Sequence, residues 1–175
     1  MTLGTRGARW SLALVASSLI ALGWTAFAQS PPRFVYNASD SVPIGWYRID
    51  PADPLATGDL VLVQLPPDAM TLAAQRGYLP ANVPLLKSVA AVPPQHVCVQ
   101  DDQMLVDDQV VARRLRQDRQ GRALPAWRAC RRLVGDELFL LSTANPESFD
   151  SRYFGPVSAR AVIGRAQPLW LESRR

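Results

Sequence analysis

The sequence predicts a mainly β domain of short antiparallel strands, preceded by one N-terminal transmembrane helix. Hydrophobic residues make up 48% of the 175 residues, which is enough to bury a core. Fifteen Pro and ten Gly disfavour long helices and favour short strands separated by turns. One long uncharged segment near the N-terminus is the exception, and it has the length of a membrane span. We therefore expect one anchor and one globular domain.

The uncharged segment covers residues 10–28. As a helix it would be about 28 Å long, close to the thickness of the hydrocarbon core of a bilayer. Arg6 and Arg9 precede it, so the positive-inside rule places residues 1–9 in the cytoplasm. Residues 29–175 would then form a domain across the membrane, which is the periplasmic side in a bacterium.

Two other interpretations of this segment are open. Ala26-Phe27-Ala28 followed by Gln29 resembles the small-residue cleavage site of a signal peptide that is removed. The uncharged run is long for the apolar region of such a peptide, which favours an anchor that is kept. A buried core helix fits poorly, because the segment is uniformly apolar.

Beyond the anchor, short apolar runs alternate with turn residues. Strands are expected at 60–65, 83–92, 96–99, 104–106, 110–112, 137–142 and 161–166. Residues 68–77 are expected to form one short helix, with Asp68 as a candidate N-cap and Gly77 as its stop. The charged, turn-rich residues 113–122 are expected to be an exposed excursion. A hairpin turn is expected at Asp107-Asp108, where Asn-Gly would be commoner.

The composition excludes several classes of function. The net charge of +4 comes mainly from scattered Arg and is typical of a solvated basic surface; contact with anionic lipid beside the anchor is an alternative. Nucleic acid is not expected as a partner, because the basic residues form no single motif and no nucleic-acid signature occurs. One His and two Cys are too few for a His/Cys metal site without carboxylate help, so no metal or other cofactor is expected.

The single His and the two Cys have structural interpretations. A Ser-His-Asp triad would have to use His96, which follows a Pro-Pro turn and is better explained as a half-exposed structural residue. In an oxidising compartment Cys98 and Cys130 are expected to form a disulfide, worth about 3–4 kcal/mol in the chain-entropy model. The alternative is two buried free thiols.

The only Lys in the protein, Lys87, lies in an apolar strand and is a candidate general base. Desolvation lowers the pKa of a buried amine, and a neutral amine can activate a Ser hydroxyl without His or Asp. Ser39 and Ser41 lie in a turn that also contains Pro43 and Gly45, and Ser41 is the candidate nucleophile. The alternative for Lys87 is a surface Lys whose stem packs on apolar residues.

A third segment, residues 148–157, combines Ser148 with an acidic and a basic residue. Asp150 and Arg152 are close enough in sequence to pair or to brace a turn, and Gly155-Pro156 forces a bend after them. A salt-bridged turn without chemistry is the alternative interpretation.

These three segments together resemble the membrane-bound signal peptidases of the S26 class, and most closely the TraF-type conjugative transfer group. Three motifs of that group occur in order, at Asn37–Tyr47, Leu86–Pro93 and Ser148–Val157. Further similarity lies in Gly77–Pro80, in Gly121–Trp127 and in the two Cys. The resemblance extends over nearly the whole chain beyond the anchor, and it implies a signal-peptidase-like β domain.

The resemblance also implies a role for each candidate residue. Ser41 matches the nucleophile and Lys87 the general base. Ser39 matches a side-chain donor to the oxyanion, beside the backbone N–H of Ser41. Ser148 matches a hydroxyl that orients the amine.

Asp150 and Arg152 match the acidic and basic residues that brace the site, with Asp150 required in the TraF-type group. One departure concerns the nucleophile, because typical signal peptidases have the Pro three residues after it and Pro43 is two after Ser41. The TraF-type pattern has the shorter spacing, and Ser39 is the alternative nucleophile.

The implied function is that of a Ser/Lys-dyad endopeptidase, single-pass in the bacterial inner membrane, with a periplasmic catalytic domain. Its substrate would be an exported pilin precursor for conjugative transfer, or another exported preprotein. Components of a conjugative type IV secretion system would be partners. In the TraF-type group the acyl group can pass to the N-terminus of the pilin itself, which gives a cyclic subunit.

Three other functions are weighed against this one. A general type I signal peptidase is disfavoured by the short chain and by the Ser-x-Pro-x-Gly spacing. A catalytically idle module of an envelope assembly would have no need of Lys87 in an apolar strand. A self-cleaving repressor would need a cytosolic DNA-binding head, and the apolar anchor argues against it.

Overall fold

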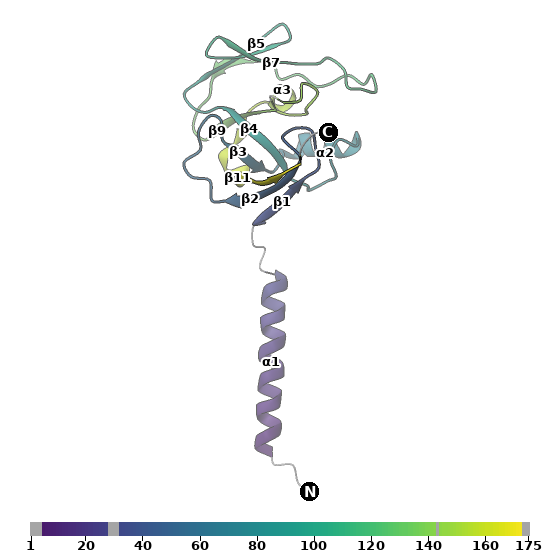
Figure 1. Ribbon diagram of the computed structural model, residues 1–175, viewed down its shortest axis with the longest axis vertical. Helices are drawn as coiled ribbons and strands as arrows, with labels where there is room; N and C mark the ends of the chain where they lie inside the picture. Colours follow the sequence, from purple (N-terminus) through teal and green to yellow (C-terminus); the bar gives the residue numbers. More distant parts are fainter. Residues whose placement is uncertain (1–4, 28–31, 143, 173–175) are drawn as a thin grey trace. The chain divides into compact units, whose positions relative to one another are not determined.

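The computed structural model describes residues 5–27, 32–142 and 144–172 (Figure 1). The chain divides into two compact units, Met1–Pro32 and Arg33–Arg175. The division lies close to the predicted boundary between an N-terminal segment and a globular domain.

The first unit contains the helix α1, Thr5–Phe27. Its described apolar side chains, including those of Trp10 and Leu12, are exposed. Within the described residues, no helix is both long enough and apolar enough to cross a membrane. The predicted membrane span is therefore not confirmed, and Ala28 and Gln29 of the alternative cleavage site lie outside the described residues.

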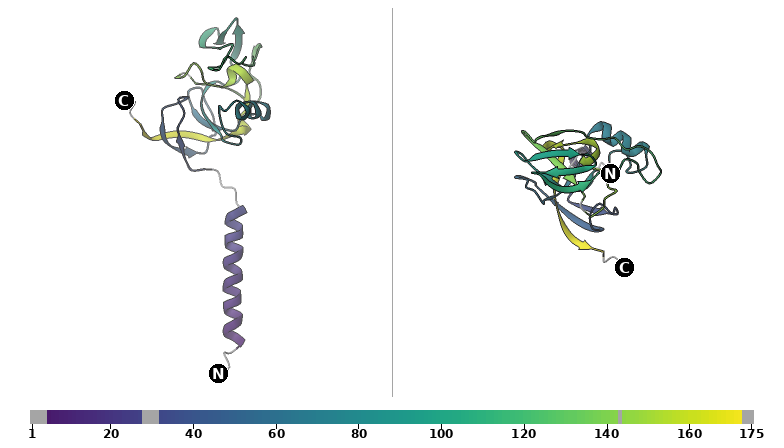
Figure 2. Two further views of the ribbon diagram at one scale, coloured as in Figure 1. Left: turned by 90° about the vertical axis from the view of Figure 1, so that its right-hand side faces the viewer. Right: turned by 90° about the horizontal axis from the view of Figure 1, so that it is seen from above.

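The second unit is mainly β and consists of two antiparallel sheets. The larger sheet has seven strands, in the spatial order β1 (Phe34–Asn37), β2 (Gly45–Asp50), β11 (Val162–Leu171), β3 (Leu60–Val63), β4 (Leu85–Ala91), β9 (Glu137–Leu141) and β10 (Val157–Ser158). The smaller sheet has four, in the order β7 (Gln109–Arg113), β6 (Gln103–Val106), β5 (His96–Gln100) and β8 (Cys130–Arg132). Figures 1 and 2 show the smaller sheet at one end of the unit.

Three short helices complete the unit: α2 (Pro67–Gln75), α3 (Ser151–Phe154) and a 3₁₀ turn at Ala159–Ala161. The prediction of Asp68 as N-cap is wrong, because Pro66 occupies that position without a side-chain cap and Asp68 lies in the first turn. Pro67 suits the first helical position, whose N–H would be unpaired anyway. Gly77 follows the C-cap with φ +70°, and this left-handed conformation confirms it as the stop.

The core forms on both faces of the larger sheet and between the two sheets. One face buries an apolar cluster made of Val42, Tyr47, Ile49, Leu62, Leu86 and Ala166. The other face buries Val61, Val63, Val89, Leu138, Leu140 and Val157. The central strands β3 and β4 contribute to both clusters, which explains why their sequences are continuous apolar runs rather than alternating ones. Lys87 pairs with Val61 across the β3–β4 ladder and therefore shares the face of the second cluster.

The β6–β7 hairpin confirms the turn predicted at Asp107-Asp108. Both residues have positive φ, +46° and +64°, as a two-residue type I′ turn requires. The Asp107 carboxylate accepts the His96 backbone N–H at 2.8 Å and the Gln95 side-chain amide at 2.9 Å. These bonds compensate for a residue less suited than Asn or Gly to this conformation.

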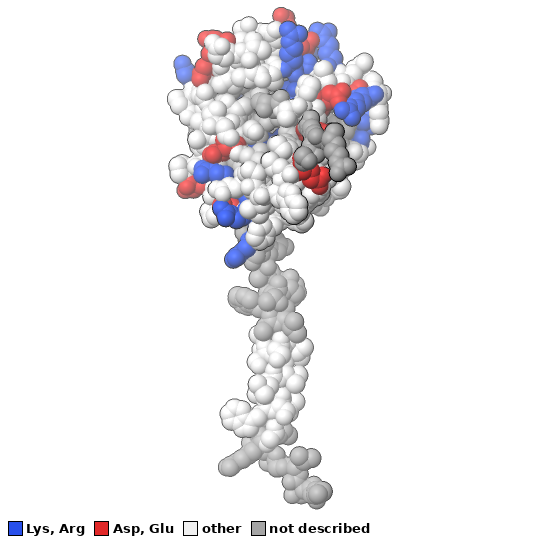
Figure 3. Space-filling view, viewed as in Figure 1, with Lys and Arg blue, Asp and Glu red and all other residues white. Residues whose placement is uncertain are grey.

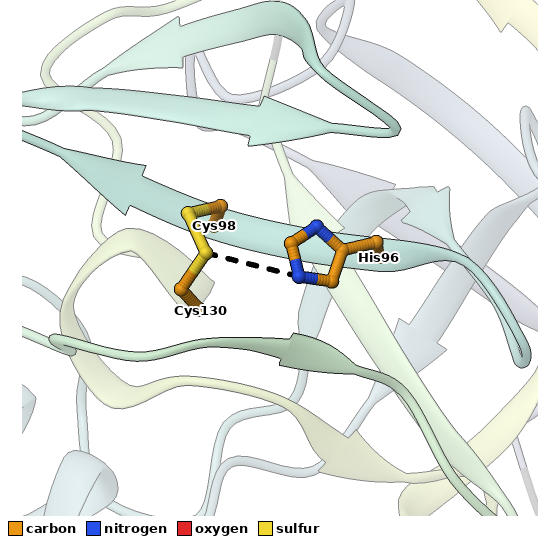
Figure 4. Close-up of a disulfide and its surroundings, with 3 residues drawn as sticks. All are labelled: His96, Cys98 and Cys130. Atoms are coloured by element: carbon orange, nitrogen blue, oxygen red, sulfur yellow. Dashed lines mark hydrogen bonds between the residues drawn. A yellow bond between two sulfur atoms is a disulfide. The ribbon is translucent and has the colours of Figure 1, made fainter.

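The predicted disulfide between Cys98 and Cys130 is confirmed, and it joins β5 to β8 at directly opposed positions. The His96 ring lies beside it, with Nε2 3.7 Å from the Cys130 sulfur (Figure 4). A disulfide sulfur carries no proton, so in this contact the ring N–H is the donor. His96 therefore belongs to the smaller sheet and has the structural setting that its sequence context predicts.

The charged excursion at 113–122 is mostly exposed but is anchored by the half-buried Asp118. Asp118 accepts hydrogen bonds from Tyr78 Oη at 2.5 Å and from Arg122 Nε at 2.7 Å. These bonds hold the pKa of Asp118 well below its usual range, although burial opposes them. On the face shown in Figure 3, basic and acidic side chains lie next to one another rather than in one broad basic region.

Candidate active site

The turn that carries Ser41 is organised by Asn37, the last residue of β1. Asn37 is 7% exposed, and its side-chain NH₂ donates to the carbonyls of Ser39 (2.8 Å), Val42 (3.0 Å) and Pro43 (3.2 Å). Its side-chain oxygen accepts the Ser39 N–H at 3.1 Å and the Ser39 hydroxyl at 2.8 Å. One buried amide thus replaces the ladder hydrogen bonds that an irregular turn cannot make.

The far end of the turn is fixed against β2 and β11. The hydroxyl of Tyr47 donates to the Pro43 carbonyl at 2.6 Å. Gly45 has φ +147°, and a Cβ at this position would lie 2.2 Å from the Trp170 carbonyl oxygen. A residue with a side chain therefore cannot replace Gly45 without moving β11 away from β2.

Lys87 projects from β4 to the half-buried hydroxyl of Ser41. Its side chain is 1% exposed, and Nζ lies 2.8 Å from Ser41 Oγ. Nζ also donates to the buried hydroxyl of Ser148, whose Oγ is 3.1 Å from Ser41 Oγ. The alternative of a surface Lys is excluded by this burial. The three polar groups form a closed cluster in which each contacts the other two.

Burial lowers the pKa of Lys87 from 10.5 to about 8, because the charged amine is desolvated. The nearby Asp150 carboxylate opposes this effect, and Arg152 adds to it. With a pKa of about 8, about a tenth of the Lys87 amines are neutral at pH 7. A neutral amine that donates to Ser148 can direct its lone pair at the hydroxyl proton of Ser41.

Asp150 and Arg152 form a buried ion pair, with side chains 0% and 1% exposed. The guanidinium binds both carboxylate oxygens, through Nε at 2.8 Å and Nη2 at 2.7 Å. Arg152 also donates to the backbone carbonyls of Arg113, Asn145, Pro146 and Ser148. Asp150 is the N-cap of α3 and accepts the Arg152 N–H. The pair therefore fixes the backbone that presents the Ser148 hydroxyl.

The structure brings the predicted residues together in one place, with one exception. Ser41, Lys87 and Ser148 are in direct contact, and Asp150 and Arg152 brace them. Ser39 is exposed, and its hydroxyl proton is donated to Asn37 rather than directed at Lys87. This geometry favours Ser41 over Ser39 as the group that Lys87 activates. The oxyanion role of Ser39 stays a prediction.

Two residues of the site lie outside the sequence prediction. Asn37 stands in the first motif, but the prediction gives it no role. Ser142 follows β9, is 2% exposed, and donates its hydroxyl proton to the Ser41 carbonyl at 2.5 Å. A single Ser after an apolar strand carries no sequence signal that distinguishes it from any other polar residue at a strand end.

The sequence of this chain is similar to those of signal peptidases and of transfer proteins named TraF. Residues 7–171 match the family model described as "Signal peptidase, peptidase S26". The "Probable conjugal transfer protein TraF" of Sinorhizobium fredii is 36% identical over 175 residues, covering 93% of this chain and 89% of that protein. A "Plasmid transfer protein TraF" of Escherichia coli is 31% identical, covering 90% of this chain and 91% of that protein.

Among solved structures, a signal peptidase I from Enterococcus faecalis matches with a TM-score of 0.39 and 18% identity, covering 65% of this chain and 97% of the other. The family-model match extends over most of the globular unit and includes every residue of the cluster around Ser41. The relatives with TraF names extend over most of both chains. The chain therefore belongs to the peptidase S26 family of signal peptidases, as a TraF-type member.

Proposed function

We propose that this protein is a serine endopeptidase in which Ser41 is the nucleophile and Lys87 the general base. The observation that carries the proposal is the 2.8 Å contact between Lys87 Nζ and Ser41 Oγ, at a site where burial lowers the amine pKa to about 8. A base is most effective when its pKa lies near the working pH. The neutral amine takes the Ser41 proton as Oγ attacks the carbonyl carbon of the scissile peptide bond.

The rest of the reaction follows from the same groups. The protonated amine of Lys87 returns its proton to the leaving nitrogen, and an acyl-enzyme remains on Ser41. The negative charge of the tetrahedral intermediate is stabilised by the Ser41 N–H and, after its hydroxyl turns from Asn37, by Ser39. Water then attacks the acyl-enzyme, with Lys87 as base again. Ser148 keeps the amine aimed at Ser41 in each step.

We propose an exported pilin precursor of a conjugation system as the substrate. The relatives named for conjugal or plasmid transfer support this choice over general processing of exported proteins. Attack on the acyl-enzyme by the amine at the N-terminus of the pilin, in place of water, would give a cyclic product. Components of a type IV secretion system would be the partners that deliver the pilin.

We further propose that the protein acts at the bacterial inner membrane, with the globular unit in the periplasm. The uncharged residues 10–28 after Arg6 and Arg9 support a single anchor with this orientation. The disulfide between Cys98 and Cys130 is in keeping with an oxidising compartment. Separation of membranes from soluble protein, followed by protease treatment of spheroplasts, tests both parts of this proposal.

The function is tested by the processing of a pilin precursor in membranes that contain the wild type, Ser41→Ala or Lys87→Ala, with the products read by intact mass. Both variants should stop processing. Ser88→Ala is the matched control, because Ser88 follows Lys87 on β4 and its side chain points to the opposite face. A product lighter than the linear form by one water indicates cyclisation.

Each other outcome of this experiment points to a different function. Cleavage by Ser41→Ala would reassign the nucleophile, with Ser39 tested next. Wild-type protein that trims ordinary exported precursors but no pilin would favour a general signal peptidase. Wild-type protein that cleaves no precursor would favour an idle module of the envelope.

A further inference from the structure

We propose that Ser142 is a positioning residue that holds the backbone of the nucleophile, and this inference rests on the proposed function. Its hydroxyl donates to the carbonyl oxygen of Ser41 at 2.5 Å, across a sequence separation of 101 residues. A carbonyl oxygen can only accept, so the direction of this bond is unambiguous. Ser142 itself would not touch the substrate carbonyl that Ser41 attacks.

The hydroxyl of Ser142 is fixed in this orientation by a second bond. The backbone N–H of Asn145 donates to Ser142 Oγ at 3.1 Å, so the oxygen accepts from one side while its proton points to Ser41. The backbone N–H of Ser142 donates to Asp150 Oδ2 at 2.9 Å. Ser142 therefore links the nucleophile to the buried carboxylate that is paired with Arg152.

Ser142 complements the hydrogen bonds of Asn37 in the turn. Asn37 holds the carbonyls of Val42 and Pro43, which follow the nucleophile. Ser142 holds the carbonyl of Ser41 itself. Because residues 38–44 form no strand, these side chains set the peptide planes that ladder hydrogen bonds would set elsewhere. The orientation of the peptide plane that follows Ser41 limits where the Cβ and Oγ of Ser41 can lie.

Ser142 also connects the nucleophile to the strand of the base. It directly follows β9, which pairs with β4 through Leu141 opposite Ser88, the residue after Lys87. One strand end is thus hydrogen-bonded to the Ser41 turn and adjoins the strand that carries Lys87. The Ser142 hydroxyl therefore helps to set the separation between nucleophile and base before any substrate binds.

Ser151 is the matched control that separates a positioning role of Ser142 from a purely structural one. Its side chain is equally buried, at 0% exposure, and its Oγ accepts the N–H of Leu140 in the same strand at 3.0 Å. The recorded bond of Ser151 goes to β9 and to neither Ser41 nor Lys87. Removal of either hydroxyl leaves a buried polar group unpaired and lowers stability, but only the loss of Ser142 should change the geometry of attack.

The test compares full-length wild type, Ser142→Ala, Ser151→Ala and Ser41→Ala in cleavage of one precursor peptide, with kcat, KM and thermal unfolding measured for each. We expect Ser142→Ala to lower kcat about 10- to 100-fold, with KM within about twofold of wild type, because misplaced groups slow the chemical step. Ser151→Ala should unfold at a lower temperature and keep its kcat. The pH midpoint of Ser142→Ala should stay unchanged, because Ser142 does not bond to the Lys87 amine.

A second pair of variants tests the Ser142 hydroxyl separately from any packing defect that Ser142→Ala causes. Ser142→Thr and Ser142→Val have nearly equal volume and differ in the hydroxyl alone, so Thr should retain far more kcat than Val. Equal rates for Thr and Val, or a kcat loss in Ser142→Ala no larger than in Ser151→Ala, would overturn the positioning role. Since Ser41→Ala is inactive if the proposed function holds, such a result leaves that function standing. An active Ser41→Ala variant would overturn both.

Discussion

Arg152 pairs with both carboxylate oxygens of Asp150, and the two charges act on Lys87 in opposite directions. Asp150 alone would stabilise the protonated amine and raise its pKa. Arg152 opposes that effect, so Asp150 can brace the backbone while the pKa of Lys87 stays low. The ion pair therefore has an electrostatic role at the site besides its mechanical one.

Arg152→Gln should raise the pKa of Lys87, because Asp150 then acts on the amine without a counter-charge. The acid limb of kcat/KM, expected near pH 8 in the wild type, should move to higher pH. An upward move of one pH unit lowers the rate at pH 7 about tenfold. The unpaired buried carboxylate should also cost about 3–5 kcal/mol of stability.

The pH profile of kcat/KM separates the raised Lys87 pKa from the loss of stability in Arg152→Gln. A loss of stability alone does not move the pH midpoint of kcat/KM. Arg160→Gln is the control, because Arg160 is 93% exposed and its ion pair with Asp136 lies in solvent. A midpoint for Arg152→Gln that equals that of the control would contradict the electrostatic role of the pair.

Lys87→Met should abolish processing and yet stabilise the protein at pH 7. The folded state lowers the Lys87 pKa from 10.5 to about 8, so holding the protonated amine costs on the order of 3 kcal/mol below pH 8. Above pH 8 the amine is neutral in the folded state while it still binds a proton in the unfolded state. Wild-type stability should therefore rise relative to Lys87→Met between pH 8 and about 10.5.

Chemical denaturation of the wild type and Lys87→Met at pH 7 and pH 9.5 measures this difference. Ser41 and Ser148 can still hydrogen-bond to each other in the variant, since their oxygens are 3.1 Å apart. If the difference in unfolding free energy between the two proteins is the same at both pH values, folding does not lower the pKa of Lys87.

Asn37→Asp should reduce activity more than Asn37→Ala. The carboxylate has no N–H to donate, and it would face the carbonyl oxygens of Val42 and Pro43 that Asn37 now binds. We expect kcat to fall at least 100-fold as the turn around Ser41 opens. The control is Asn82→Gly, an exposed position with φ +64° where Gly is suited. Equal kcat for Asn37→Asp and this control would show that Asn37 does not position the nucleophile.

The reacting groups can be predicted from the sequence because their chemistry restricts residue type. A single Lys in an apolar strand indicates a perturbed amine, and the motifs around Ser41 and Ser148 supply its partners. The roles of Asn37 and Ser142 depend instead on which backbone carbonyls lie opposite them. Any small polar side chain can make such bonds, so only the three-dimensional pairing of segments far apart in sequence reveals them.

Some strands can likewise be predicted from the sequence and others cannot. The strands β3, β4 and β9 are buried on both faces and are therefore visible as apolar runs. The edge strand β1 and its neighbour β2 are not predicted, since residues 36–47 contain Pro43 and Gly45 and have the pattern of a turn. The extended form of β2 depends on pairing with β11 at the other end of the chain, and β1 pairs in turn with β2. The short polar strands β8 and β10 give no periodic signal.

The disulfide provides a prediction in which stability and activity separate. Cys98→Ala with Cys130→Ala should lower the free energy of unfolding by about 3–4 kcal/mol, the value for a loop of this length in the chain-entropy model. The bridge joins β5 to β8 in the smaller sheet, whereas Lys87 lies on β4 of the larger sheet and Ser41 lies in the turn between its strands β1 and β2. Processing at 20 °C should therefore stay within about twofold of wild type, while heat inactivation occurs at a lower temperature. If the double variant is folded at 20 °C, as shown by circular dichroism, but does not cleave, the smaller sheet takes part in substrate binding or positions the site.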